Sequence, residues 1–109
     1  MSNGRGDDEF RVEVVDEAGR PVVRVRGEID VATAERFREA IAESLERDAR
    51  LVIDMSDTSF MDSTGLSALI RAYHDTGRVK EAVQLRAVRP PVLRTLEISG
   101  ISDLVTVVG

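Results

Sequence analysis

The residues that could carry chemistry are few, and most of them lie between Asp54 and Thr64. This stretch holds three aspartates and the hydroxyl groups of Ser63 and Thr64, and the single histidine of the chain, His74, follows it. Three kinds of chemistry therefore have to be weighed. They are nucleophilic catalysis by a serine, binding of a divalent cation by carboxylates, and covalent modification of a hydroxyl group.

Nucleophilic catalysis by Ser63 is not supported. His74 follows it by eleven residues on one predicted helix, and at 1.5 Å per residue this separation is about 16 Å, far beyond hydrogen-bond reach. The flanking sequence Met61-Asp62-Ser63-Thr64-Gly65 also lacks the first glycine of a nucleophile elbow. We therefore predict that the protein is not an enzyme, that it has no catalytic residues, and that His74 faces solvent.

Metal binding by the carboxylates is the second alternative. Asp54, Asp57 and Asp62 follow a predicted strand, and carboxylate oxygens suit Mg²⁺ or Ca²⁺. A receiver-like site would also need acidic residues just after the first strand, whereas Asp7 and Asp8 precede it. The chain has no glycine-rich phosphate-binding motif either. We predict no metal and no cofactor, and interpret the aspartates as loop and capping residues.

Modification of a hydroxyl group is the alternative that remains. Ser63 and Thr64 fall at the start of a predicted helix, where such residues often serve only as caps. The same position tolerates an anion, because the free N–H groups and the dipole of a helix start favour one by about 0.3–1 kcal/mol. A phosphate would add a charge of about −1.5 to −2. Phosphorylation of Ser63 should therefore leave the fold intact and alter the surface.

Two elements have to position these hydroxyl groups. The apolar run Leu51-Val52-Ile53 is typical of a strand covered on both faces, which Asp54 should end. A helix over about 63–76, stopped by Gly77, is predicted by apolar residues at offsets of three, four and seven, namely Leu66, Leu69, Ile70 and Tyr73. Residues 60–65 then join the carboxyl end of a strand to the start of a helix, where open α/β sheets place their sites.

The rest of the chain predicts an α/β domain. The expected order is strand 10–14, strand 22–25, helix 31–48, the strand from 51, helix 63–76, strand 82–88, a helix opened by Pro90-Pro91 and ended by Gly100, and strand 104–108. Asp30 and Thr33 are candidate caps. Loop 16–21 predicts an antiparallel hairpin slightly longer than the tightest kind. We expect a mixed sheet, antiparallel first and parallel later, with about three packed helices.

Composition restricts the function further. The 109 residues carry a net charge of −5 without a basic stripe, which argues against nucleic-acid binding. There is no cysteine, so a reducing compartment is allowed. No apolar segment approaches the roughly 20 residues that span a bilayer. We expect a cytoplasmic protein without membrane insertion, formed by a flexible tail at 1–9 and one domain at 10–109.

Three motifs carry a family resemblance. The run from Leu51 to Asp54 followed by Phe60-Met61-Asp62-Ser63-Thr64-Gly65-Leu66 resembles the signature of STAS domains, in particular of bacterial anti-sigma factor antagonists. Gly27-Glu28-Ile29-Asp30 is similar to the second motif of that family, and Ser99-Gly100-Ile101 to the third. The match is collinear from about Phe10 to Val108. One departure is Lys80-Glu81, where members often have two glycines.

The resemblance implies a function and a site. In the family, an anti-sigma factor that is itself an ATP-dependent serine kinase phosphorylates the serine of the central motif, which is Ser63 in this chain. The unphosphorylated form binds this kinase and frees a sigma factor, and a metal-dependent serine phosphatase restores binding. Thr64 would be a secondary acceptor, and Asp62 would support Ser63. The resemblance implies a partner-binding surface formed by Asp30, Asp62, Ser63, Thr64, Gly65 and Leu66.

A second interpretation of the same resemblance stays open. The chain would then be a constitutive STAS scaffold, such as a stressosome-like or lipid-transport-like subunit, in which Ser63 is only a helix cap. Binding that survives a negative charge at Ser63 would indicate the scaffold, and binding that is lost would indicate the switch. The oligomeric state stays open as well.

Overall fold

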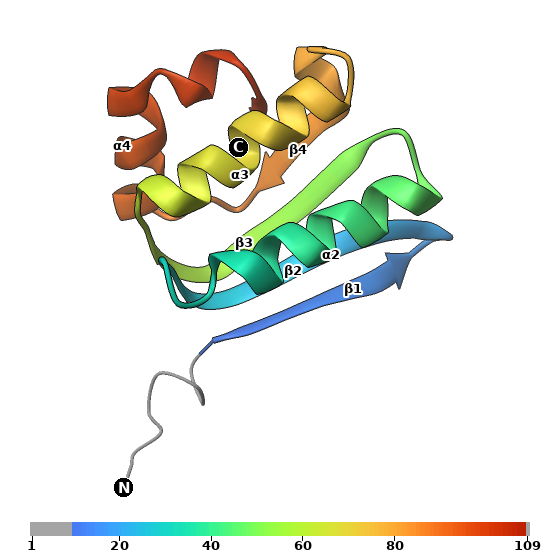
Figure 1. Cartoon of the computed structure of the whole chain (residues 1–109), viewed down its shortest axis with the longest axis horizontal. Coiled ribbons are helices and arrows are strands. Elements are labelled where there is room, and N and C mark those ends of the chain that lie inside the picture. The colour runs from blue at the N-terminus through green and yellow to red at the C-terminus, as the bar shows by residue number, and fades with distance from the viewer. Residues whose placement is uncertain (1–9, 109) are drawn as a thin grey trace, which may run out of the picture.

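The computed structural model describes residues 10–108, so the predicted tail at 1–9 lies outside the described residues. The elements are β1 (Arg11–Glu17), β2 (Arg20–Ile29), α2 (Ala34–Arg47), β3 (Leu51–Met61), α3 (Ser63–Asp75), β4 (Val83–Arg86), α4 (Pro90–Ser99) and β5 (Thr106–Val108) (Figure 1). Two short 3₁₀ helices, η1 (Lys80–Ala82) and η2 (Ile101–Asp103), precede β4 and β5.

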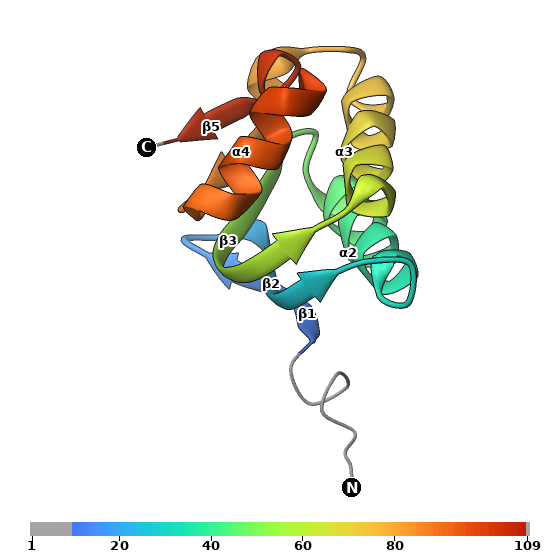
Figure 2. The same cartoon turned by 90° about the vertical axis from the view of Figure 1, so that its left-hand side faces the viewer.

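The strands form one mixed sheet in the order β1-β2-β3-β4-β5. The pair β1 and β2 is antiparallel, and every later pair is parallel, which confirms the predicted fold class. Helices α2 and α3 lie against the same face of the sheet (Figures 1 and 2), and α4 packs against β3. Phe37 of α2, Leu69 of α3 and Leu96 of α4 join the sheet in one fully buried core.

The hairpin between β1 and β2 is tighter than the sequence predicted. Glu17 pairs with Arg20, so that only Ala18 and Gly19 form the loop. Both have positive φ angles, 51° and 83°, as in the two-residue turn whose twist matches that of the flanking strands. The prediction of a longer loop was wrong because cross-strand pairing continues to the last residue before the turn.

The burial and the length of strand β3 both differ from the prediction. Leu51, Ile53 and Met55 are fully buried, whereas Val52 and Asp54 are only half-buried. This alternation belongs to a strand with one face covered, so the prediction of cover on both faces was wrong. Asp54 does not end the strand, which continues to Met61.

Asp54 is accepted within β3 because its carboxylate interacts with a guanidinium group on the neighbouring strand β4. Arg86 of β4 makes two hydrogen bonds of 2.9 Å to the carboxylate of Glu17 and a third of 3.4 Å to Asp54 Oδ2. The N–H of Ser56 donates to Asp54 Oδ1 at 3.0 Å. Three strands thus contribute to one charged cluster, Glu17, Asp54 and Arg86, which we call the Arg86 cluster.

The Arg86 cluster predicts a loss of stability in acid. The hydrogen bonds from Arg86 lower the pKa of Glu17. Burial acts to raise the pKa of Asp54, but hydrogen bonds from Ser56 and the charge of Arg86 outweigh it, so this pKa is lowered as well. A carboxyl group whose pKa is lower in the folded chain stabilises the fold above its unfolded pKa, near 4, and loses this effect as the pH falls through the folded pKa.

We therefore expect Arg86→Met to lower the free energy of unfolding at pH 7, with the difference from wild type shrinking below about pH 4 as the carboxylates become protonated. Urea denaturation at intervals between pH 7 and pH 2.5 measures this difference. Parallel pH profiles of the two proteins would show that Arg86 does not set the pKa values of Glu17 and Asp54.

The buried face of α3 is turned relative to the predicted stripe. Gly65, Ala68, Leu69 and Ala72 are buried, whereas Ile70 is 37% exposed, and its predicted place in the stripe was wrong. The buried residues are mostly small. They bring the helix backbone close to the sheet, and hydrophobic periodicity alone favours the larger side chains.

The C-terminal ends of α3 and α4 agree with the prediction that a glycine follows each helix. Gly77 and Gly100 follow α3 and α4 with φ angles of 83° and 82°, as in left-handed helix C-caps. Helix α2 begins at Ala34, three residues later than predicted, because β2 continues to Ile29. Strand β4 ends at Arg86, before Ala87, whose φ of 55° breaks the extended conformation.

Candidate functional site

The candidate site lies where the parallel strands β2 and β3 end side by side. Ile29 and Met61 are paired across the two strands, and the Asp62 N–H donates a hydrogen bond of 3.0 Å to the Ile29 carbonyl. Asp30 and Asp62 are the next residues of the two strands. The sheet therefore brings together the β2–α2 and β3–α3 loops (Figure 2), which the motifs alone place 32 residues apart.

Asp62 caps helix α3. Its Oδ1 accepts the Thr64 N–H at 2.8 Å and also a hydrogen bond from the Thr64 hydroxyl. Its main-chain carbonyl accepts the N–H groups of Gly65 and Leu66, both at 3.1 Å. The Thr64 hydroxyl lowers the pKa of Asp62 most, and the backbone N–H groups add to this effect against the smaller influence of burial. Asp62 is therefore a firmly ionised residue that supports the start of the helix.

The two neighbouring hydroxyl groups differ in access. Ser63 is exposed, and among the hydrogen bonds of residues 10–108 none involves its side chain. Thr64 is half-buried, and its hydroxyl donates to Asp62. A modifying enzyme can reach the Ser63 oxygen without breaking a contact, whereas Thr64 would first have to release Asp62.

The start of α3 offers little to a new anion. The N–H groups of Thr64, Gly65 and Leu66 already donate to Asp62. These three N–H groups are therefore not free to stabilise a phosphate, contrary to the expectation from the sequence. Of the two predicted effects, only that of the helix dipole remains. A phosphate on Ser63 would stay at the surface beside the Asp62 carboxylate.

Asp30 organises the neighbouring loop. Its Oδ1 accepts the N–H groups of Ala32 and Thr33 at 2.9 and 3.2 Å. The Thr33 hydroxyl donates to the Glu28 carbonyl at 2.8 Å and accepts the Asp30 N–H at 3.0 Å. Both predicted capping residues thus act in the turn before α2, while Thr33, the N-cap residue of that helix, makes no side-chain cap bond. This turn holds Asp30 in a fixed orientation near Asp62.

Gly65 and Leu66 differ from the other predicted site residues. Gly65 is buried, and a Cβ atom added there would lie 2.5 Å from Met61 Cγ and 2.9 Å from Ile29 Cγ2. Leu66 is half-buried and packs against the core. The structure therefore gives both residues a packing role beneath the loops, through which Gly65 sets the position of Ser63.

Two exposed apolar residues beside the site were not among the predicted site residues. Phe60 is 46% exposed and Val31 is 81% exposed. Phe60 lies three residues before Ser63, and Val31 follows Asp30. Phe60 pairs with Glu28, a polar residue of the neighbouring strand, and this register is visible only in the structure. Apolar side chains thus flank both acidic loops.

Residues 10–108 contain no group of three or more histidine or acidic residues positioned to hold a metal ion. His74 is exposed and accepts a hydrogen bond of 3.1 Å from Arg78 Nε. No helix in the described part of the chain is both long and apolar enough to cross a membrane.

Known proteins with similar sequences and the same fold place the chain in a family. The STAS domain family model matches residues 9–108. The anti-sigma-B factor antagonist of Bacillus subtilis (strain 168) is 31% identical over 85 residues, which are 78% of this chain and 78% of that protein.

Two solved structures share the fold. The anti-sigma factor antagonist from Mycobacterium paratuberculosis has 30% identity and a TM-score of 0.78, with 98% of this chain and 89% of that one covered. The Bacillus cell fate determinant SpoIIAA in its phosphorylated form has 22% identity and a TM-score of 0.63, with 92% and 91% covered. The chain belongs to the STAS domain family, and the relatives that it resembles in sequence are anti-sigma factor antagonists.

Proposed function

We propose that this protein is an anti-sigma factor antagonist whose activity is switched by phosphorylation of Ser63. In its unphosphorylated form it binds an anti-sigma factor with serine kinase activity and releases a sigma factor in the cytoplasm. Phosphorylation of Ser63 by that kinase ends the binding, and a serine phosphatase restores it. The single observation that carries the proposal is the exposed Ser63 hydroxyl, which makes no hydrogen bond within residues 10–108, beside a Thr64 hydroxyl held by Asp62.

The relatives support this proposal. The B. subtilis protein is named an antagonist of anti-sigma-B factor, and SpoIIAA, which shares the fold, has a solved structure in a phosphorylated form. In this chain, the motif places a serine at the start of α3, with its side chain in solvent. A kinase that binds the two acidic loops would therefore find its acceptor within the same contact surface.

The surroundings of Ser63 explain how a phosphate would act. Neither Asp30 nor Asp62 forms an ion pair with a described residue. No cation of the described chain is therefore paired with these carboxylates beside Ser63. The added charge of about −1.5 to −2 would meet the partner directly. A surface fitted to a small neutral hydroxyl would have to desolvate this charge or reject it.

A kinase assay tests the site. The wild-type protein is incubated with the anti-sigma factor kinase of its own organism and ATP, and intact-mass and peptide mass spectrometry then locate the product. We expect one phosphate on Ser63, none on Ser63→Ala, and unchanged labelling of Ser67→Ala, which removes an exposed hydroxyl one turn further along α3. Equal labelling of Ser63→Ala and wild type would contradict the assignment.

A further inference from the structure

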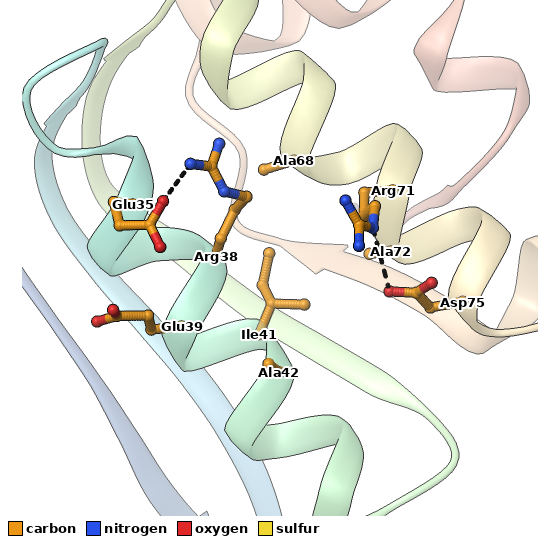
Figure 3. Close-up of a pocket in the computed structure, with 9 residues that line it drawn as sticks. All are labelled: Glu35, Arg38, Glu39, Ile41, Ala42, Ala68, Arg71, Ala72 and Asp75. Atoms are coloured by element: carbon orange, nitrogen blue, oxygen red, sulfur yellow. Dashed lines mark hydrogen bonds and ion pairs between the residues drawn. The ribbon is translucent and has the colours of Figure 1, made fainter.

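A groove of about 260 Å³ lies between α2 and α3 (Figure 3), and Ser63 is not among the residues that line it. Its floor is apolar and mostly built from small residues, namely Ile41, Ala42, Ala68 and Ala72. Its rims are charged and consist of Glu35, Arg38 and Glu39 on α2 and Arg71 and Asp75 on α3. The volume suits one side chain of a partner, with an apolar stem on the floor and a charged end at the rim.

The floor of the groove shares one stripe of α3 with Thr64 of the candidate site. Thr64, Ala68 and Ala72 follow one another at intervals of four residues, which places them on one stripe of α3. Ala68 and Ala72 line the groove, so the stripe leads from the groove to the start of the helix, where Ser63 lies. A partner bound at the acidic loops can therefore reach the groove without leaving the surface of the domain.

Two arginines lie on opposite walls of the groove. The guanidinium groups of Arg38 and Arg71 extend from opposite walls, and no carboxylate is placed between them (Figure 3). Arg38 pairs with Glu35, and Arg71 Nε lies 4.0 Å from Asp75 Oδ2, each within its own helix. The two arginine side chains are 44% and 78% exposed. Exposed pairs of this kind are weak, so an incoming anion can compete for both guanidinium groups.

We propose that the groove receives an acidic side chain, Asp or Glu, of the anti-sigma factor partner and holds its carboxylate between Arg38 and Arg71. The inference rests on the proposed function and identifies the chemistry of the partner surface. Arginine binds carboxylates through two parallel hydrogen bonds, and two arginines from opposite walls restrict where the carboxylate can lie. Glu39 extends away from α3 (Figure 3) and does not oppose the anion.

This arrangement couples the groove to the phosphate. Arg71 follows Ser63 by eight residues, which is about 12 Å along the helix axis, and helical side chains extend back toward the N-terminus. The bound carboxylate therefore lies roughly one Debye length, about 8–10 Å, from a phosphate on Ser63. The two negative charges repel each other, which weakens the partner at a second point besides the acceptor itself.

The affinity of the full chain for the anti-sigma factor that phosphorylates Ser63 tests the proposal. We expect Arg38→Gln and Arg71→Gln each to weaken binding by about tenfold, with less dependence on NaCl than wild type. Glu35→Gln and Asp75→Asn free the guanidinium groups and should leave binding equal or tighter. Arg36→Gln is the matched control, because Arg36 is on α2 but lies over the Phe10 ring at 4.7 Å. Circular dichroism confirms that each variant is folded.

The outcomes separate the inference from the proposed function. If Arg38→Gln and Arg71→Gln bind as tightly as wild type while Ser63 is still phosphorylated, the proposal for the groove is overturned and the proposed function is not affected. Weaker binding by Glu35→Gln and Asp75→Asn would indicate a basic side chain as the occupant and would also overturn it. Failure of the wild-type protein to bind any serine kinase anti-sigma factor would overturn both proposals. Weakening confined to the two groove arginines, with Arg36→Gln unchanged, is the supporting result.

Discussion

Phosphorylation of Ser63 should weaken binding of the anti-sigma factor at least a hundredfold, whereas Ser63→Ala should bind as tightly as the unphosphorylated protein. A hundredfold change corresponds to about 2.7 kcal/mol, which is within reach because a phosphate brings a charge of about −1.5 to −2 into a contact built for a neutral hydroxyl. Ser63→Glu should show part of the effect, since it carries one negative charge. Calorimetric titration of the purified proteins without ATP measures each affinity.

The matched control for this experiment is Ile98→Glu. Ile98 is 81% exposed on α4 and is neither in the acidic loops nor among the residues that line the groove, so that the variant carries the same charge outside both proposed contacts. We expect at most a severalfold change in its affinity. The free energy of unfolding should change by less than about 0.5 kcal/mol in all Ser63 variants, as is usual for exposed residues without contacts. Equal affinities of the phosphorylated and unphosphorylated proteins would favour the constitutive scaffold.

Enlarging Gly65 should have the largest effect on stability. An added Cβ atom would lie 2.5 Å from Met61 Cγ and 2.9 Å from Ile29 Cγ2, and both residues are fully buried. Alanine gains about 0.5–1 kcal/mol over glycine from helix propensity, but overpacking of this kind costs about 1–3 kcal/mol. We therefore expect Gly65→Ala to be destabilised by about 1–2 kcal/mol, and Gly65→Val by more than about 3 kcal/mol.

Urea denaturation of Gly65→Ala, Gly65→Val and Ser67→Val measures this cost. Ser67→Val places the same valine in the same helix at an exposed position, where only a few tenths of a kcal/mol are expected from helix propensity. Because Ile29 and Met61 carry the two acidic loops, we also expect the Gly65 variants to bind the partner less tightly. A Gly65→Ala protein more stable than wild type would show that Met61 and Ile29 move aside without cost.

The sequence alone determined the fold class and predicted where the candidate site lies, since both inferences depend on local patterns. Apolar periodicity located the strands and helices, and Gly77 and Gly100 end α3 and α4 as predicted. The join at residues 60–65 follows from a buried strand that leads into a helix. The length of β3 could not be predicted, because Asp54 is accepted within the strand through Arg86, which lies 32 residues further along the chain. The tight hairpin could not be predicted either, because the register of β1 on β2 is set by pairing across the strands.

Only the tertiary structure decided what each site residue can do. Ser63 and Thr64 are adjacent in the sequence and chemically alike, yet Asp62 holds one hydroxyl and leaves the other in solvent. A glycine is needed at position 65 because two side chains from different strands leave no room for a Cβ atom. Arg38 and Arg71 line one groove although 33 residues separate them. The physical reason is the same in each case: access, packing and charge depend on neighbours in space, which the packing of α2 and α3 on the sheet brings together.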